Sequence, residues 1–170
     1  MKDAEGSILQ VEEAILEFGA TGIIGHEQGA TIAALVAARS ILGEGVPLKF
    51  AVLCGAAMPP AGSTCAALLQ RMSDSNEQAS IPTLHCVSKN GVPPEPALEV
   101  AACFGDGGRV LWHERGAAMP SRSWWEEAEG FPEKVIGGNK WVTQYGPAKF
   151  YDAKDNYFRS EPGSRPPPRL

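Results

Sequence analysis

The sequence contains no apolar run near the roughly 20 residues that a membrane span needs, and no N-terminal basic segment followed by an apolar one. It has no excess of basic residues either: the formal net charge is −5 at pH 7, which argues against nucleic acid as a partner. Its 4 cysteines form no C-x-x-C pair, so neither a zinc site nor a disulfide framework is expected. Together these absences predict a cytoplasmic protein without a membrane span.

The remaining composition is that of an ordinary globular protein, with 44% apolar and 21% charged residues in a chain of 170. One core is expected at this length, and we place a single domain over residues 1–130. Residues 131–162 form an aromatic C-terminal extension that either packs on the domain or a partner, or is disordered. Residues 163–170 are expected to be a disordered tail.

The stretch Thr21–Arg39 is the most informative part of the chain. It reads as a short apolar strand, a turn bounded by glycines and an alanine-rich helix. The turn, from Gly25 to Gly29, has the G-x-S-x-G spacing of a nucleophile elbow, in which a strained turn presents a catalytic serine. Here the central residue is Glu27, which has no hydroxyl to activate.

Apolar periodicity predicts helices and strands in alternation, and therefore a parallel sheet with right-handed crossovers. A capping box of Ser7 and Gln10 is expected to start the first helix. The predicted helices are Ser7–Phe18, Gln28–Leu42, Thr64–Met72, Pro94–Phe104 and Ser121–Glu129. The predicted strands are Thr21–Gly25, Pro47–Cys54, Ile81–Val87 and Arg109–His113.

The order of these features from Ser7 to about Pro120 resembles a fungal family of small serine hydrolases in the α/β-hydrolase superfamily, which includes polyketide-releasing esterases and thioesterases. The resemblance is carried by GHEQGATIAALVAARS, KFAVLCGAAMPP, IPTLHCVSKNGVPPEPALEVAACF and RVLWHERGAAMP. It implies an α/β-hydrolase-like three-layer fold with about four parallel strands. It also implies a truncated one, because family members carry roughly half a domain before the first helix.

In a truncated sheet, the strand Thr21–Gly25 would lie at an edge instead of the centre. An apolar edge strand promotes association. Two copies joined through this strand would form one continuous sheet about a two-fold axis, and the aromatic extension would help to cover the seam. We therefore expect a homodimer; the alternative is that the extension covers the edge of its own chain.

The catalytic triad that the resemblance implies does not carry over. Glu27 stands at the nucleophile position, Gly91 at the acid position, and Ala117 at the position expected for the histidine. Without a nucleophile and its supporting pair, serine-hydrolase activity is not expected.

Three residues are candidates for catalysis: Glu27, His26 and His113. Each also has a simpler interpretation, as a remnant of the lost nucleophile, a surface histidine and a strand-end histidine. His85, inside a predicted strand, is expected to be a buried, hydrogen-bonded core residue. No carboxylates lie at ligand spacing from the three histidines, so we expect neither a metal nor a cofactor. Candidate substrate contacts are Trp112, Trp124, Trp125, Met58 and Met119, although Trp124 and Trp125 also suit a dimer interface.

Two hypotheses for function follow. The first is a non-hydrolytic enzyme of secondary, polyketide-type metabolism that binds an apolar small molecule and promotes a cyclisation, isomerisation or dehydration. The second is an inactive pseudohydrolase that acts as a binding or scaffolding subunit. An active esterase or thioesterase is a third alternative, which the glutamate at position 27 disfavours.

Overall fold

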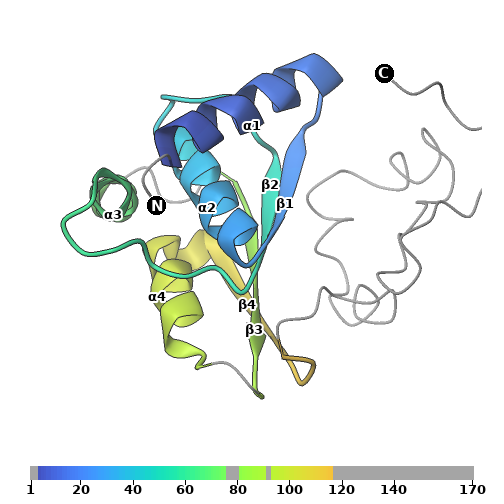
Figure 1. Cartoon of the computed structure of the whole chain (residues 1–170), viewed down its shortest axis with the longest axis vertical. Coiled ribbons are helices and arrows are strands. Elements are labelled where there is room, and N and C mark those ends of the chain that lie inside the picture. The colour runs from blue at the N-terminus through green and yellow to red at the C-terminus, as the bar shows by residue number, and fades with distance from the viewer. Residues whose placement is uncertain (1–3, 76–80, 91–92, 117–170) are drawn as a thin grey trace, which may run out of the picture.

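The computed structural model of the chain describes residues 4–75, 81–90 and 93–116 (Figure 1). The helices are α1 (Ala4–Phe18), α2 (Gln28–Ile41), α3 (Thr64–Asp74) and α4 (Glu95–Cys103), with a short 3₁₀ helix at Gly105–Gly107. The strands are β1 (Gly22–His26), β2 (Phe50–Cys54), β3 (Thr83–Ser88) and β4 (Gly108–His113). The predicted helix Ser121–Glu129, the aromatic extension and the tail lie outside the described residues.

The strands form one parallel sheet in the order β1-β2-β3-β4. Because right-handed crossovers between strands taken in sequence all run the same way, they place the connecting helices on one face. α2 packs on β1 and β2, α4 packs on β3 and β4, and α1 and α3 both contact α2 (Figure 1). The predicted α/β fold with about four parallel strands is therefore confirmed, and β1 lies at an edge of the sheet formed by the described residues.

The main core lies between the sheet and the helix layer. α2 is fully buried along most of its length, because its small side chains let the helix approach β1 and β2 closely. The buried residues of α2 are Ala30, Thr31, Ala33, Ala34, Leu35, Val36, Ala37, Ala38 and Ile41. A second, smaller cluster of Val52, Cys54, Leu84 and Cys86 lies on the other face of the sheet, since successive strand residues alternate between faces.

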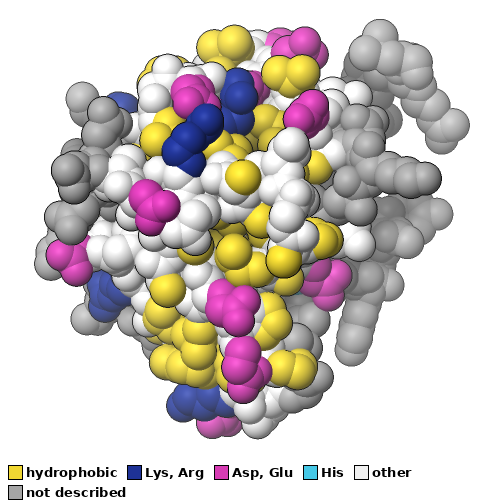
Figure 2. Space-filling model, turned by 90° about the vertical axis from the view of Figure 1, so that its left-hand side faces the viewer, with side chains coloured by type: hydrophobic (Ala, Val, Ile, Leu, Met, Phe, Trp, Pro, Cys, Tyr) yellow, Lys and Arg dark blue, Asp and Glu magenta, His cyan; other side chains and the backbone are white. Residues whose placement is uncertain are grey.

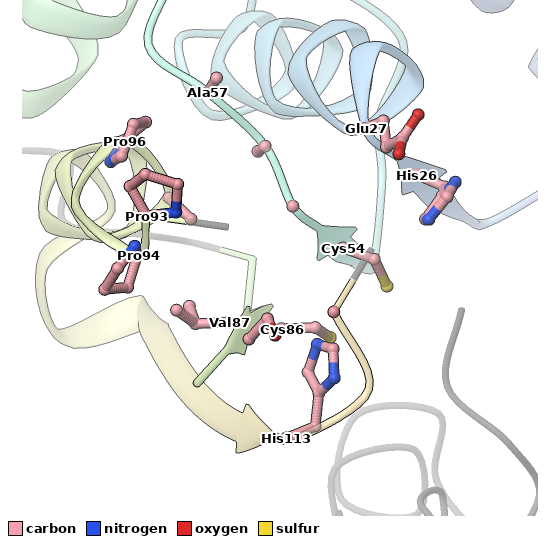
Figure 3. A pocket seen from close by; sticks show the side chains of 15 residues that line it. His26, Glu27, Cys54, Ala57, Cys86, Val87, Pro93, Pro94, Pro96 and His113 are labelled. Atoms are coloured by element: carbon pink, nitrogen blue, oxygen red, sulfur yellow. The ribbon is translucent and has the colours of Figure 1, made fainter. Parts of the chain in front are cut away.

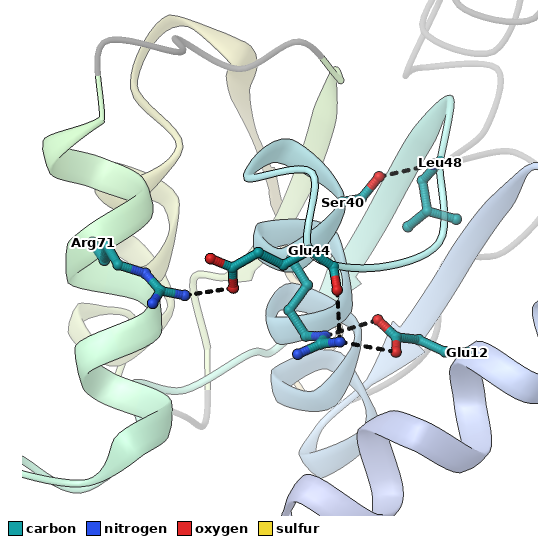
Figure 4. A network of polar contacts seen from close by, with 6 residues as sticks. Glu12, Ser40, Glu44, Leu48 and Arg71 are labelled. Carbon is teal, nitrogen blue, oxygen red and sulfur yellow. Dashed lines mark hydrogen bonds and ion pairs between the residues drawn. The ribbon is translucent and has the colours of Figure 1, made fainter.

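A polar contact fixes α1 against α2. Arg39 of α2 donates from Nε to Glu12 Oε1 of α1 at 2.9 Å, and from Nη2 to the Glu44 carbonyl at 2.7 Å (Figure 4). Glu12 is buried, so its carboxylate depends on this pairing. On the helix side of the molecule, hydrophobic side chains are interspersed with acidic and basic ones (Figure 2).

Two sequence expectations require correction. α1 begins at Ala4, so Ser7 lies within the helix and the predicted capping box is wrong. Alanine favours the helical conformation, and Glu5 in the first turn complements the helix dipole. β2 and β3 begin at Phe50 and Thr83, later than predicted. Pro82, which directly precedes β3, has no N–H to donate to a strand ladder.

Candidate functional site

A pocket of about 190 Å³ lies at the carboxyl ends of the four strands, where open α/β sheets bind ligands (Figure 3). Most of its lining is apolar. The lining residues are His26, Glu27, Cys54, Gly55, Ala56, Ala57, Cys86, Val87, Ser88, Pro93, Pro94, Pro96, Ala97, His113 and Gly116.

The elbow geometry is present, with a carboxylate at its apex. Glu27 adopts φ 50° and ψ −117° and is the one non-glycine with positive φ among the described residues. Gly25 is required below it, because a Cβ there would clash with the Gly29 carbonyl oxygen. The Glu27 N–H donates to the Cys54 carbonyl at 2.8 Å, and the Glu27 carbonyl accepts from Ala30 N at 3.0 Å. Hydrogen bonds on both sides of Glu27 thus hold the strained turn, and the Glu27 side chain is exposed at the pocket.

His113, the last residue of β4, borders the same pocket. The Arg115 N–H donates to His113 Nδ1 at 3.3 Å, so in the neutral ring the proton is on Nε2. Burial lowers the pKa of His113, which favours this neutral form. Its carbonyl accepts from Lys89 N at 2.7 Å, which ties the end of β4 to the end of β3. His113 therefore presents a neutral imidazole at the edge of the pocket.

The loops around the pocket are anchored by side-chain hydrogen bonds. Thr31 Oγ1 donates to the Ala57 carbonyl and accepts from the Ala57 N–H, both at 3.1 Å, which ties the loop after β2 to α2. Ser88 Oγ donates to the Asn90 carbonyl at 2.7 Å and accepts from the Asn90 N–H at 3.1 Å. Such bonds hold the rim of the pocket in place before any ligand binds.

The structure brings together the three predicted catalytic candidates, since Glu27, His26 and His113 all line the pocket. Glu27 and His26 stand on one side of it and the prolines on another (Figure 3). Trp112 does not line it: side chains alternate along β4, so Trp112 and its neighbour His113 point to opposite faces of the sheet. Met58 packs against the main core instead. Met119, Trp124 and Trp125 lie outside the described residues.

Sequence reasoning did not identify several residues of the pocket. Cys54 and Cys86, which the sequence did not mark as site residues, both reach its lining. Pro93, Pro94 and Pro96, at the start of α4, form an apolar wall (Figure 3). Their position in the sequence could have identified these residues, because each lies near or after the carboxyl end of a predicted strand.

Within residues 4–75, 81–90 and 93–116, no group of three or more His, Cys, Asp or Glu side chains could hold a metal ion. In the same ranges no helix has the length and apolar character needed to cross a bilayer.

Comparison with known proteins supplies the family. Residues 1–128 match the family model described as "Serine hydrolase (FSH1)". No curated protein and no solved structure matches the chain. The family match covers most of the chain, including all four strands and the elbow. The chain therefore belongs to the serine hydrolase (FSH1) family.

Proposed function

We propose that this protein binds an apolar small molecule in the pocket and promotes a non-hydrolytic cyclisation, isomerisation or dehydration in secondary, polyketide-type metabolism. The observation that carries the proposal is Glu27: a carboxylate occupies the strained elbow of a hydrolase-family fold, at an apolar pocket that His113 also lines. Strained backbone persists mainly where function requires it, because it costs about 1–3 kcal/mol.

The proposed chemistry is proton transfer without a covalent intermediate. Glu27 takes a proton from carbon or oxygen of the ligand, and His113 places a neutral imidazole at the same pocket, beside the reacting ligand. His26, next to Glu27 and half-buried, assists in binding at the same rim. The apolar walls exclude water, which favours rearrangement over hydrolysis.

Hydrolysis of the family type is disfavoured by the residues themselves. Attack on an ester by a serine hydrolase needs a hydroxyl that a histidine and an acid activate. Residue 27 is a glutamate, and Gly91 and Ala117 stand where the resemblance places the other two groups. A fluorophosphonate probe that labels the purified protein would contradict this proposal.

The experiment is deletion of the gene, followed by metabolite profiling and incubation of the mutant's extract with purified protein. We expect one compound to accumulate in the mutant and the purified protein to convert it into an isomer or a dehydrated product. Conversion by Glu27→Gln should fall by about 10²–10⁴-fold, the usual effect of removing a general base. Glu99→Gln, which changes an exposed carboxylate on α4 outside the pocket, is the matched control. Conversion that needs a second protein would instead support the binding-subunit alternative.

A further inference from the structure

Two thiols lie side by side at the pocket. Cys54 in β2 and Cys86 in β3 are register partners in neighbouring parallel strands. Such strands run about 4.8 Å apart, and paired residues carry their side chains on the same face of the sheet. Both residues border the pocket (Figure 3).

The other two cysteines are placed differently. Cys65 is buried in α3, and Cys103 in α4 donates from Sγ to the Glu99 carbonyl at 3.4 Å. Neither lines the pocket. A molecule that enters the pocket therefore meets a single pair of thiols.

The pair supplies two sulfur ligands without a third protein ligand, since no cluster of three metal-binding side chains exists among the described residues. Zinc takes three or four protein ligands, so a zinc-type centre does not suit this pair. Paired sulfurs select soft centres. A trivalent arsenic that already carries one organic group needs only two more bonds, and two sulfurs provide them.

The pocket also has room for the organic group. Its volume is about 190 Å³, and a dry cavity of about 150 Å³ is enough to hold benzene. Pro93, Pro94 and Val87 offer apolar contacts to such a ring.

We propose that Cys54 and Cys86 form a dithiol site that binds one organic trivalent arsenical, with arsenic bridging both sulfurs and the organic group in the pocket. When an organic arsine oxide binds, two S–H bonds and the As=O bond break and two As–S bonds form. Both protons leave with the oxygen as one water molecule. No electron is transferred, so no oxidant or reductant is needed.

The protonated state of Cys86 suits this reaction. Interaction with the neighbouring Cys54 thiol, together with burial, raises the pKa of Cys86, so Cys86 enters as a thiol that gives up its proton to the leaving oxygen. The site rests on strand register and on the pocket, and it does not depend on the proposed catalysis.

The test is titration of the reduced, folded full-length protein with phenylarsine oxide, followed by mass spectrometry of the intact protein. We expect one adduct per chain, formed with loss of one water, that a dithiol releases and an excess of monothiol does not. Cys54→Ser and Cys86→Ser should each lower the affinity about 100-fold, because each removes one arm of a two-point attachment. Cys103→Ser should bind as the unchanged protein does.

Peptide mapping of the unchanged protein guards against variants that fail to fold. After reaction with the thiol cross-linker dibromobimane, the peptides that contain Cys54 and Cys86 should be joined to each other. The proposal is overturned if the unchanged protein takes up no arsenical, if both single variants bind as tightly as it does, or if the cross-link involves Cys65 or Cys103.

Discussion

At the scale of single residues, two histidines of adjacent strands have opposite surroundings. His113 ends β4 at the pocket, whereas His85 in the middle of β3 is 1% exposed and packs its ring against Phe104, with 5.2 Å between the ring centroids. His85 Nε2 lies 2.9 Å from Thr83 Oγ1, and Nδ1 is buried without a hydrogen-bond partner among the described residues. The expectation of a buried, hydrogen-bonded core histidine is confirmed, but half of its hydrogen-bonding capacity is unused.

His85 should make the protein sensitive to mild acid. Burial lowers the pKa of His85 from 6.5 to about 4, so the unfolded chain binds a proton there below pH 6.5 while the folded protein does not. Stability from this group is therefore present above pH 6.5 and is lost as the pH falls towards 4. We expect the free energy of unfolding to drop by about 1.5 kcal/mol between pH 6.5 and 5, as measured by urea denaturation at a series of pH values.

His85→Gln is the control, since glutamine fills much of the same space and does not titrate. Its free energy of unfolding should be lower at neutral pH and change less over the same interval. An equal slope in the two proteins would show that other groups cause the acid sensitivity.

At the scale of elements, the helix layer is assembled by packing and by one buried ion pair. Among the described residues, α1 packs chiefly on α2. The Arg39–Glu12 pair that joins them has side-chain exposures of 28% and 9%, whereas the Arg71–Glu44 pair between α3 and the loop after α2 has exposures of 58% and 42% (Figure 4). The two pairs offer the same chemistry at different depths.

Arg39→Met should destabilise the protein by about 3 kcal/mol, because it leaves the Glu12 carboxylate buried without its cation. Arg71→Met removes the exposed pair and should cost less than about 1 kcal/mol. Guanidinium denaturation followed by circular dichroism measures both values. Equal losses in the two variants would mean that burial does not set the strength of these pairs.

At the scale of the whole molecule, the arrangement of the sheet raises the question of association. β1 lies at one edge of the sheet formed by the described residues and carries Ile24 at 44% exposure, and β4 lies at the other edge with Trp112 at 41%. We propose that two copies join through β1, because apolar edge strands pair readily with another chain. A lysine introduced on this edge should oppose the pairing.

Light scattering coupled to gel filtration tests this homodimer. We expect the mass of a dimer for the unchanged protein and of a monomer for Ile24→Lys. Trp112→Lys, a matched change at the opposite edge, should leave the mass of the dimer unchanged. A monomeric mass for the unchanged protein at high concentration would refute the proposed association.

Much of this architecture can be predicted from short stretches of the sequence. Apolar runs bounded by glycine and proline predict the strands β1 to β4, and the alanines of α2 predict a slim helix. The glycines at 25 and 29 predict the elbow. Each of these features depends on residues that are close together in the sequence. The helix start at Ser7 was wrong because a capping pattern can also occur inside a helix.

The composition of the site was decided by tertiary structure. No local pattern shows that Cys54 and Cys86 are register partners, or that prolines at the start of α4 line the same pocket as the elbow. Nor does one show that Trp112 points away from the pocket while His113 borders it. Register and loop paths depend on how strands far apart in the chain align, and a shift of one residue sends a side chain to the other face of the sheet. The sequence alone determined that a carboxylate stands at the elbow; only the fold determined which groups surround it.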